Sequence, residues 1–161
     1  MAEVSTQRNT VIFNASKKEL FTTNSGFKVL NRKLKTAWKV AQNKDEIADD
    51  RIEQARVFVL AGPKEKFTSS EFETLKKYVE TGGSLLVMMG EGGDSKYNTN
   101  MNFFLEEYGI AVNNDAVVRT HFYKYFHPKE ALIANGVLNR AISQAAGKMV
   151  GVTEDEENNA Q

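Results

Sequence analysis

The chain has 161 residues, of which 41% are hydrophobic and 26% are charged, and this length suits one globular domain with one core. It carries 21 basic and 21 acidic residues, so no net charge attracts nucleic acid, and we expect no nucleic-acid partner. It contains no cysteine, which excludes disulfides, thiolate catalysis and cysteine-bound metal within this chain.

Residues 1–9 open the chain as a polar segment without the apolar core of a secretory signal. We treat them as an N-terminal extension of a single α/β domain over residues 10–150. No apolar run approaches the ~20 residues that a membrane span needs. The sequence therefore predicts a soluble, cytosolic chain with no membrane insertion.

Short apolar runs alternate with amphipathic segments along the first third of the chain. A first strand is predicted over residues 10–13, which are short and β-branched, and turn residues follow it from Asn14 onward. An amphipathic helix is predicted over residues 27–38, where apolar residues recur at spacings of three and four. A second strand over residues 38–41 and a short helix over residues 45–52 follow.

The clearest local pattern is a β-α-β unit. Two apolar runs, residues 57–61 and 84–89, have the length and composition of buried strands. Between them, hydroxyl residues beginning at Thr68 can cap a helix, Glu71 lies just inside it, and a pair of glycines ends it. Because parallel strands joined by a helix need a right-handed crossover, this unit implies a parallel sheet covered by helices.

The later part of the chain continues the alternation. A glycine-rich turn is predicted over residues 90–95, and a helix follows that is capped at residues 98–100 and closed by Gly109. Residues 110–112 form a predicted fifth strand. Residues 116–118 either pair with that strand as a hairpin or continue it, and periodicity does not decide between the two.

Two segments complete the chain. Residues 132–146 are weakly helical in pattern, and residues 151–161 are acidic, poor in apolar residues and predicted to be a disordered tail. The order of the elements is typical of an α/β fold: a Rossmann-like, doubly wound, mostly parallel sheet with helices on both faces. Three to five parallel strands are predicted.

In doubly wound folds, ligands bind at the carboxyl ends of the strands. A small-molecule site for a neutral, sugar-like ligand is one hypothesis for this edge of the sheet. The predicted ligand-binding residues follow strands one, three and four: Asn14, Gly62, Gly90, Glu91 and Gly92.

The turn after the fourth strand has the outline of a nucleophile elbow, in which small residues permit a sharp turn. No Ser or Cys occupies it. Glu91 could act as a carboxylate nucleophile or base, but a tight turn with a helix-capping acid is the favoured interpretation. Glu91 and Asp94 would repel a phosphate, and the glycine patterns of phosphate-binding loops are incomplete, so we predict no cofactor.

Aromatic and basic residues are intermixed between Arg119 and Lys129. Tyr, Phe and Arg are the residues that anchor protein interfaces, so this stretch is a candidate partner-binding surface, and a core role for the same aromatics competes with it. His121 and His127 lie six residues apart, which is no same-face pair on a helix, so no metal site is predicted. The predicted partner-binding residues are Arg119, Tyr123, Lys124, Tyr125 and Phe126.

Several motifs closely resemble the N-terminal GIFT-type domain of the intraflagellar transport protein 52 family. The resemblance extends from about Thr10 to Gly147. The motifs that carry it are residues 10–15, 61–67, 89–93, 106–110, 112–119 and 124–131.

The resemblance implies a fold related to class I glutamine amidotransferases and a role in complex B of ciliary transport trains. It implies other complex B subunits as partners, at the cilium or flagellum, the basal body and the cytoplasm. No catalytic residue carries over, because the amidotransferase cysteine position coincides with Glu91, so the resemblance implies lost activity. The family's domain is longer than this chain, and we expect residues 10–150 to lack its C-terminal end.

Overall fold

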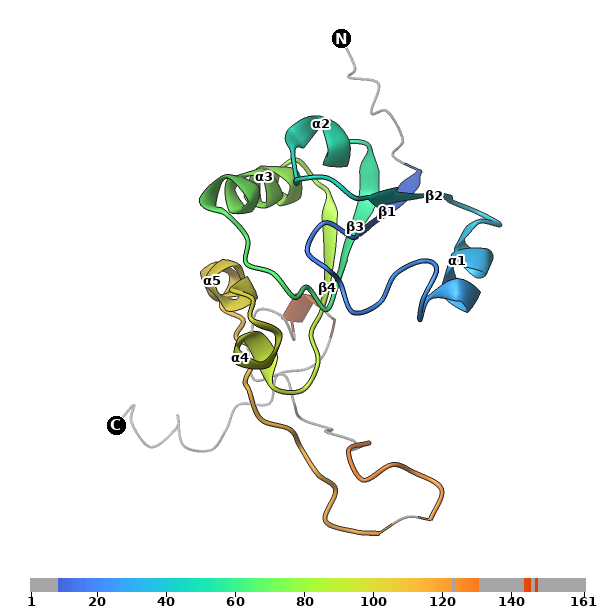
Figure 1. Cartoon of the computed structure of the whole chain (residues 1–161), viewed down its shortest axis with the longest axis vertical. Coiled ribbons are helices and arrows are strands. Elements are labelled where there is room, and N and C mark those ends of the chain that lie inside the picture. Colours follow the sequence, from blue (N-terminus) through green and yellow to red (C-terminus); the bar gives the residue numbers. More distant parts are fainter. Residues whose placement is uncertain (1–8, 123, 131–143, 146, 148–161) are drawn as a thin grey trace. The chain divides into compact units, whose positions relative to one another are not determined.

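The computed structural model describes residues 9–122, 124–130, 144–145 and 147 (Figure 1). The chain divides into two compact units between Ala116 and Val117, and each unit is described by itself. The predicted acidic tail and most of the predicted helix over residues 132–146 lie outside the described residues, so those predictions stay predictions. No helix in the described part of the chain has both the length and the apolar composition needed to cross a bilayer.

The first unit is built on a sheet of four parallel strands, in the spatial order β2-β1-β3-β4. The strands are β1 (Thr10–Asn14), β2 (Lys39–Asn43), β3 (Ala55–Ala61) and β4 (Ser84–Met88). These confirm the four strands expected from the apolar runs. Every strand is parallel to its neighbours, so all the carboxyl ends meet at one edge of the sheet.

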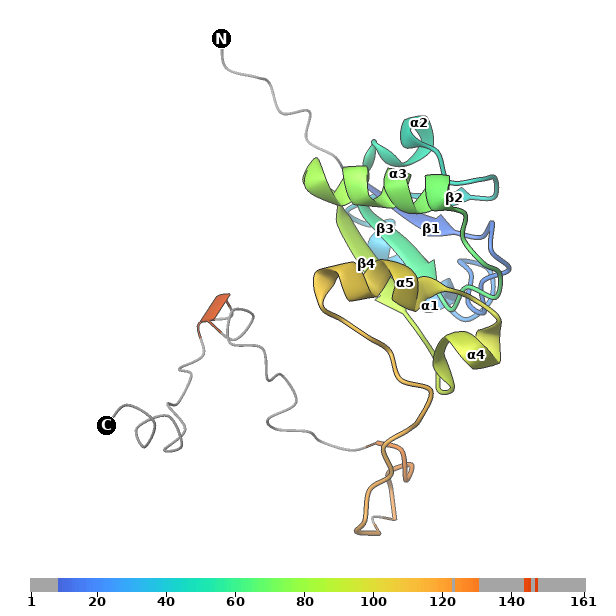
Figure 2. The same ribbon diagram turned by 90° about the vertical axis from the view of Figure 1, so that its left-hand side faces the viewer.

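Helices cover both faces of this sheet (Figures 1 and 2). The helix α1 covers one face, and α2, α3 and α5 lie over the other. The helices are α1 (Lys28–Leu34), α2 (Asp49–Ile52), α3 (Ser69–Glu80), α4 (Gly93–Tyr97) and α5 (Met101–Leu105), followed by the 3₁₀ turn η1 (Glu106–Tyr108). Three of them differ from expectation: α1 and α2 are shorter than predicted, and α4 forms where only a glycine-rich turn was expected.

The longest of these helices, α3, has 12 residues and begins with the capping box that the sequence predicts. The Glu71 backbone N–H donates to the Thr68 hydroxyl at 3.3 Å, and the Thr68 N–H donates to the Glu71 carboxylate at 2.8 Å. Its apolar stripe, with Phe72, Leu75 and Tyr78 buried, lies on the sheet. The Tyr78 hydroxyl donates to the carbonyls at Ala55 and at the start of β4, which ties the end of α3 to two strands.

Alternation along β3 divides the core between the two faces of the sheet. Phe58 and Leu60 point into the larger cluster, beneath α3 and α5, whereas Val59 and Ala61 point into a smaller one beneath α1. All four side chains are buried, which explains why this strand is a continuous apolar run in the sequence.

The predicted fifth strand over residues 110–112 is wrong, because the structure has irregular chain there. The Asn102 side chain accepts from the Val112 N–H at 2.8 Å and donates to the Val112 carbonyl at 2.8 Å. The side chain of Asn102 therefore satisfies the same two backbone groups that a neighbouring strand would satisfy. No strand forms over residues 116–118 either.

Phe103 and Phe104 are sequence neighbours on α5 with opposite environments. Phe104 is 2% exposed and stacks with Phe72 at 5.8 Å, whereas Phe103 is 65% exposed. We expect Phe104→Ala to lower the free energy of unfolding by ~3–5 kcal/mol, because it empties a packed core position. Phe103→Ala should cost about 1 kcal/mol or less, mainly through its tilted contact with Phe72. Urea unfolding of both variants measures these changes. Equal losses in the free energy of unfolding would contradict the placement of Phe104 in the core and Phe103 at the surface.

Candidate functional site

A buried polar cluster lies at the carboxyl ends of β1 and β2. Asn14 and Asn43 are the last residues of these strands and lie side by side in the register. The Asn43 amide donates to the Asn14 side-chain oxygen at 2.9 Å, and the Asn14 amide in turn donates to the Glu19 carboxylate. Both asparagines are buried, so the Asn14 side chain that was predicted to bind a ligand is engaged by the protein itself.

Glu19 completes this cluster as a buried carboxylate. Besides the Asn14 amide, it accepts a hydrogen bond from the Lys17 backbone N–H at 3.0 Å. Burial raises the pKa of Glu19 above its ordinary value, and the hydrogen bonds from the surrounding amides oppose that rise. The carboxylate thus holds the loop after β1 in place at a cost in desolvation.

The same loop is joined to the start of α3 by an ion pair. The Lys17 ammonium lies 2.7 Å from the Glu71 carboxylate, and the two side chains are 12% and 0% exposed. The ammonium also lies 5.2 Å from the centre of the Phe67 ring. Glu71 therefore both caps α3 and binds the β1 loop, a second role that the capping pattern alone does not reveal.

The loop after β1 also covers Gly62, another predicted ligand-binding position. The Leu20 N–H donates to the Gly62 carbonyl at 2.8 Å. Gly62 has a φ angle of +69°, and a Cβ atom there would lie 3.0 Å from the Leu20 Cβ. The protein's own chain thus packs against the backbone that a ligand would have to approach.

The turn between β4 and α4 differs from a nucleophile elbow in its backbone. In such an elbow the nucleophile itself takes the strained conformation, but among the described residues the non-glycine residues with positive φ are Lys18 and Asn98. Here the positive φ angles follow Glu91, at Gly92 (+92°) and Gly93 (+51°). Glu91 is exposed to solvent and is not among the residues with positive φ.

Two other residues of this turn, Gly90 and Asp94, have structural roles. A Cβ atom on Gly90 would lie 2.2 Å from the Tyr97 hydroxyl oxygen, so Tyr97 packs directly on this glycine. Asp94 accepts from the backbone N–H groups of Met101 (3.1 Å) and Asn102 (2.9 Å). Asp94 therefore caps the start of α5. The helix-capping role that the sequence predicts for Glu91 stays a prediction.

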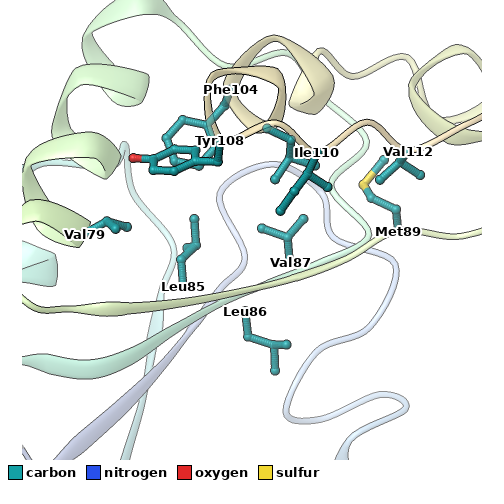
Figure 3. Close-up of a pocket in the computed structure, with 10 residues that line it drawn as sticks. Val79, Leu85, Leu86, Val87, Met89, Phe104, Tyr108, Ile110 and Val112 are labelled. Carbon is teal, nitrogen blue, oxygen red and sulfur yellow. The ribbon is translucent and has the colours of Figure 1, made fainter. Parts of the chain in front are cut away.

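An apolar groove of about 530 Å³ lies beside β4 in the first unit (Figure 3). Leu85, Val87 and Met89 face the side of Phe104 and Tyr108, whereas Leu86 points to the opposite side of the strand. The residues lining it are Val79, Leu85, Leu86, Val87, Met89, Phe104, Leu105, Tyr108, Ile110 and Val112. The sequence did not predict this groove, because the apolar run over residues 84–89 indicates only a buried strand.

In the second unit, Arg119 closes a loop over residues 119–130. Its guanidinium donates to three backbone carbonyls, those of His121 (2.8 Å), Phe126 (3.0 Å) and Glu130 (3.2 Å). Its backbone N–H donates to the Pro128 carbonyl at 2.8 Å. Arg119 was predicted as a partner-binding residue, and the structure uses its side chain inside the loop.

The aromatic side chains of this loop are exposed. Phe122 is 89% exposed, Tyr125 is 82% exposed and Phe126 is 52% exposed. Tyr123 lies outside the described residues. His127 accepts from the Lys129 N–H at 3.2 Å through Nδ1, and the described part of the chain contains no cluster of three or more His, Cys, Asp or Glu that could hold a metal ion.

The geometry defines a class of protein: a doubly wound α/β domain with an exposed carboxylate, Glu91, in the turn after its fourth strand. A family model described as the IFT52 GIFT domain matches residues 10–161, and the chain belongs to this family. The chain is 60% identical over 151 residues to the mouse (Mus musculus) "Intraflagellar transport protein 52 homolog", and 59% identical over 157 residues to the human (Homo sapiens) one.

These matches cover nearly all of this chain but a small part of the relatives. They include 94% and 96% of the chain, and 35% and 36% of the mouse and human proteins. The chain thus spans about a third of the length of these relatives. A solved structure named "mmIFT52 N-terminal domain" matches with a TM-score of 0.73 and 60% identity, over 86% of this chain and 61% of that one. The expected α/β fold and family resemblance are confirmed.

Glu19 makes the stability of the domain depend on pH. Because its pKa is raised in the folded state, the folded protein holds this proton more tightly than the unfolded chain. The contribution of Glu19 to the free energy of unfolding is therefore most favourable below the ordinary glutamate pKa. This contribution is lost as pH rises through the higher pKa of the folded state. We expect the free energy of unfolding of Glu19→Gln, minus that of the unchanged chain, to increase as pH rises from about 4.5. Urea unfolding of both chains at several pH values measures this difference in the free energy of unfolding. A difference that does not change with pH would contradict the effect of burial on Glu19.

Arg119 should control the order of the second-unit loop. Arg119→Lys keeps the charge but loses the planar fork that reaches several carbonyls, so local opening should become easier by on the order of 1–2 kcal/mol. We expect about tenfold faster hydrogen exchange at the Glu130 backbone amide, which donates to the His127 carbonyl. Lys124→Ala, which removes a cation from the same loop, is the control. Equal protection in the Arg119 variant and the unchanged chain would rule out this role.

Proposed function

We propose that this chain is a non-enzymatic scaffold domain of an intraflagellar transport complex B subunit, needed for assembly of transport trains and of cilia or flagella. The observation that carries the proposal is the identity of about 60% to intraflagellar transport protein 52 homologues over nearly the whole chain. Its place of action would be the cilium or flagellum, the basal body and the cytoplasm. Its partners would be other subunits of complex B.

The geometry of the elbow supports the absence of catalysis. In a nucleophile elbow, the nucleophile is held in a strained turn and is activated by a neighbouring base. At this turn the glycines take the positive φ angles, and Glu91 is an exposed carboxylate outside the set of residues with positive φ. The buried carboxylates Glu19 and Glu71 are both engaged, the first by amides and the second by a helix cap and Lys17.

The sugar-like ligand hypothesis gains no support at the strand ends. The Asn14 amide, which would recognise ligand hydroxyls, donates to Glu19 and accepts from Asn43. Leu20 packs on Gly62, and Tyr97 packs on Gly90. Polar groups that already satisfy one another have little to gain from binding a neutral ligand.

A binding assay tests the scaffold function directly. The 161-residue chain, immobilised through its N-terminus, would be presented to each purified complex B subunit in turn. We expect at least one subunit to bind with a dissociation constant in or below the micromolar range, about −8 kcal/mol.

An activity assay tests the non-enzymatic part of the proposal. Glutamine hydrolysis and glycoside hydrolysis should stay at the level of the buffer blank for the unchanged chain and for Glu91→Gln alike. Activity that is present in the chain and lost in Glu91→Gln would overturn the proposal, since it would show Glu91 to be a working nucleophile or base.

A further inference from the structure

The loop over residues 119–130 exposes three aromatic side chains to solvent. Phe122, Tyr125 and Phe126 are each more than half exposed, and they occur within five residues of one another. Single exposed apolar side chains are common, but an apolar patch next to polar residues is typical of an interaction site. The aromatic residue types found here are also the ones enriched among the energetic hot spots of interfaces.

The loop is already organised before any partner arrives. The Arg119 guanidinium holds three backbone carbonyls, and its charge lies 5.8 Å from the Phe126 ring centre. Ordering a loop during association costs free energy, so a loop that is closed in advance binds at lower cost. Arg119 is therefore a positioning residue, and the exposed rings are the groups available for contact.

Charge indicates the kind of partner. The loop carries the cations Arg119, Lys124 and Lys129 and a single acid, Glu130, whereas the whole chain has equal numbers of acidic and basic residues. The Lys124 ammonium lies 5.5 Å from the centre of the Tyr125 ring, so the exposed cation and the exposed ring form one surface. A complementary surface would offer an apolar pocket with an acidic rim.

We propose that this loop is the docking surface for an acidic protein partner, a complex B subunit whose apolar pocket receives Phe122 and Tyr125 and whose acidic rim faces Lys124. This inference rests on the proposed scaffold function and names the surface that would perform it. A membrane is the weaker candidate, since recognition of anionic lipid typically takes about four to eight clustered cations and stable anchoring takes two signals.

The test compares matched aromatic variants of the full 161-residue chain against each purified complex B subunit. The double variant Phe122→Ala/Tyr125→Ala should raise the dissociation constant of the bound subunit at least about 30-fold, with an unchanged melting temperature because both rings are exposed. Phe103→Ala removes an exposed ring from α5 and should change the dissociation constant less than about threefold. Lys124→Glu should slow association and reverse its dependence on salt.

Four other outcomes would overturn the inference. A subunit that binds the double variant as tightly as the unchanged chain would contradict this surface while leaving the scaffold function intact. If no subunit binds the unchanged chain, both proposals fail. A melting temperature that falls by many degrees in the double variant would place the rings in the core. Binding to phosphatidylcholine vesicles with about 30% phosphatidylserine that is lost in the double variant, with subunit binding retained, would identify a membrane surface instead.

Discussion

The fold depends on one constraint at the carboxyl edge of its sheet: polar side chains that are buried there must find partners within the protein. Glu71 is the centre of this arrangement, since its carboxylate is fully buried and a buried charge without a partner costs several kcal/mol. Lys17 supplies the opposite charge and the Thr68 N–H supplies a hydrogen bond, both to Oε2, whereas the buried Oε1 has no hydrogen-bond partner among the described residues. The start of α3 and the loop after β1 are therefore held by the same carboxylate.

This constraint also decides what the edge can do. In an open α/β sheet the carboxyl ends of the strands are the ordinary place for a ligand, because loops there leave polar groups unpaired. Here Asn14, Asn43 and Glu19 pair with one another, and Leu20 covers the backbone of Gly62. The result is an edge that stabilises the fold and has few polar groups left for chemistry.

The sequence predicted those elements whose cause is local. The four strands follow from continuous apolar runs, and α3 follows from a capping box and an amphipathic stripe. The failures have non-local causes. The fifth strand is missing because Asn102, ten residues earlier, binds the backbone of Val112, and no periodicity records such a contact. Similarly, Asn14 pairs with Asn43, 29 residues away, and no local pattern shows this hydrogen bond. From the sequence alone, Asn14 at its strand end therefore looks like a ligand-binding group.

The two units hold their polar groups in different ways. In the first unit, Asn14, Asn43 and Glu19 at the strand ends bond to one another, so changing one would disturb the fold. In the second, one arginine satisfies the backbone, and the rings of Phe122 and Tyr125 remain in solvent. Loops held by a few backbone contacts can change their exposed side chains with little effect on folding. Under the proposed scaffold function, the exposed side chains of this loop can therefore vary without endangering the sheet, and this is the physical reason to seek partner contacts on the loop and not at the strand ends.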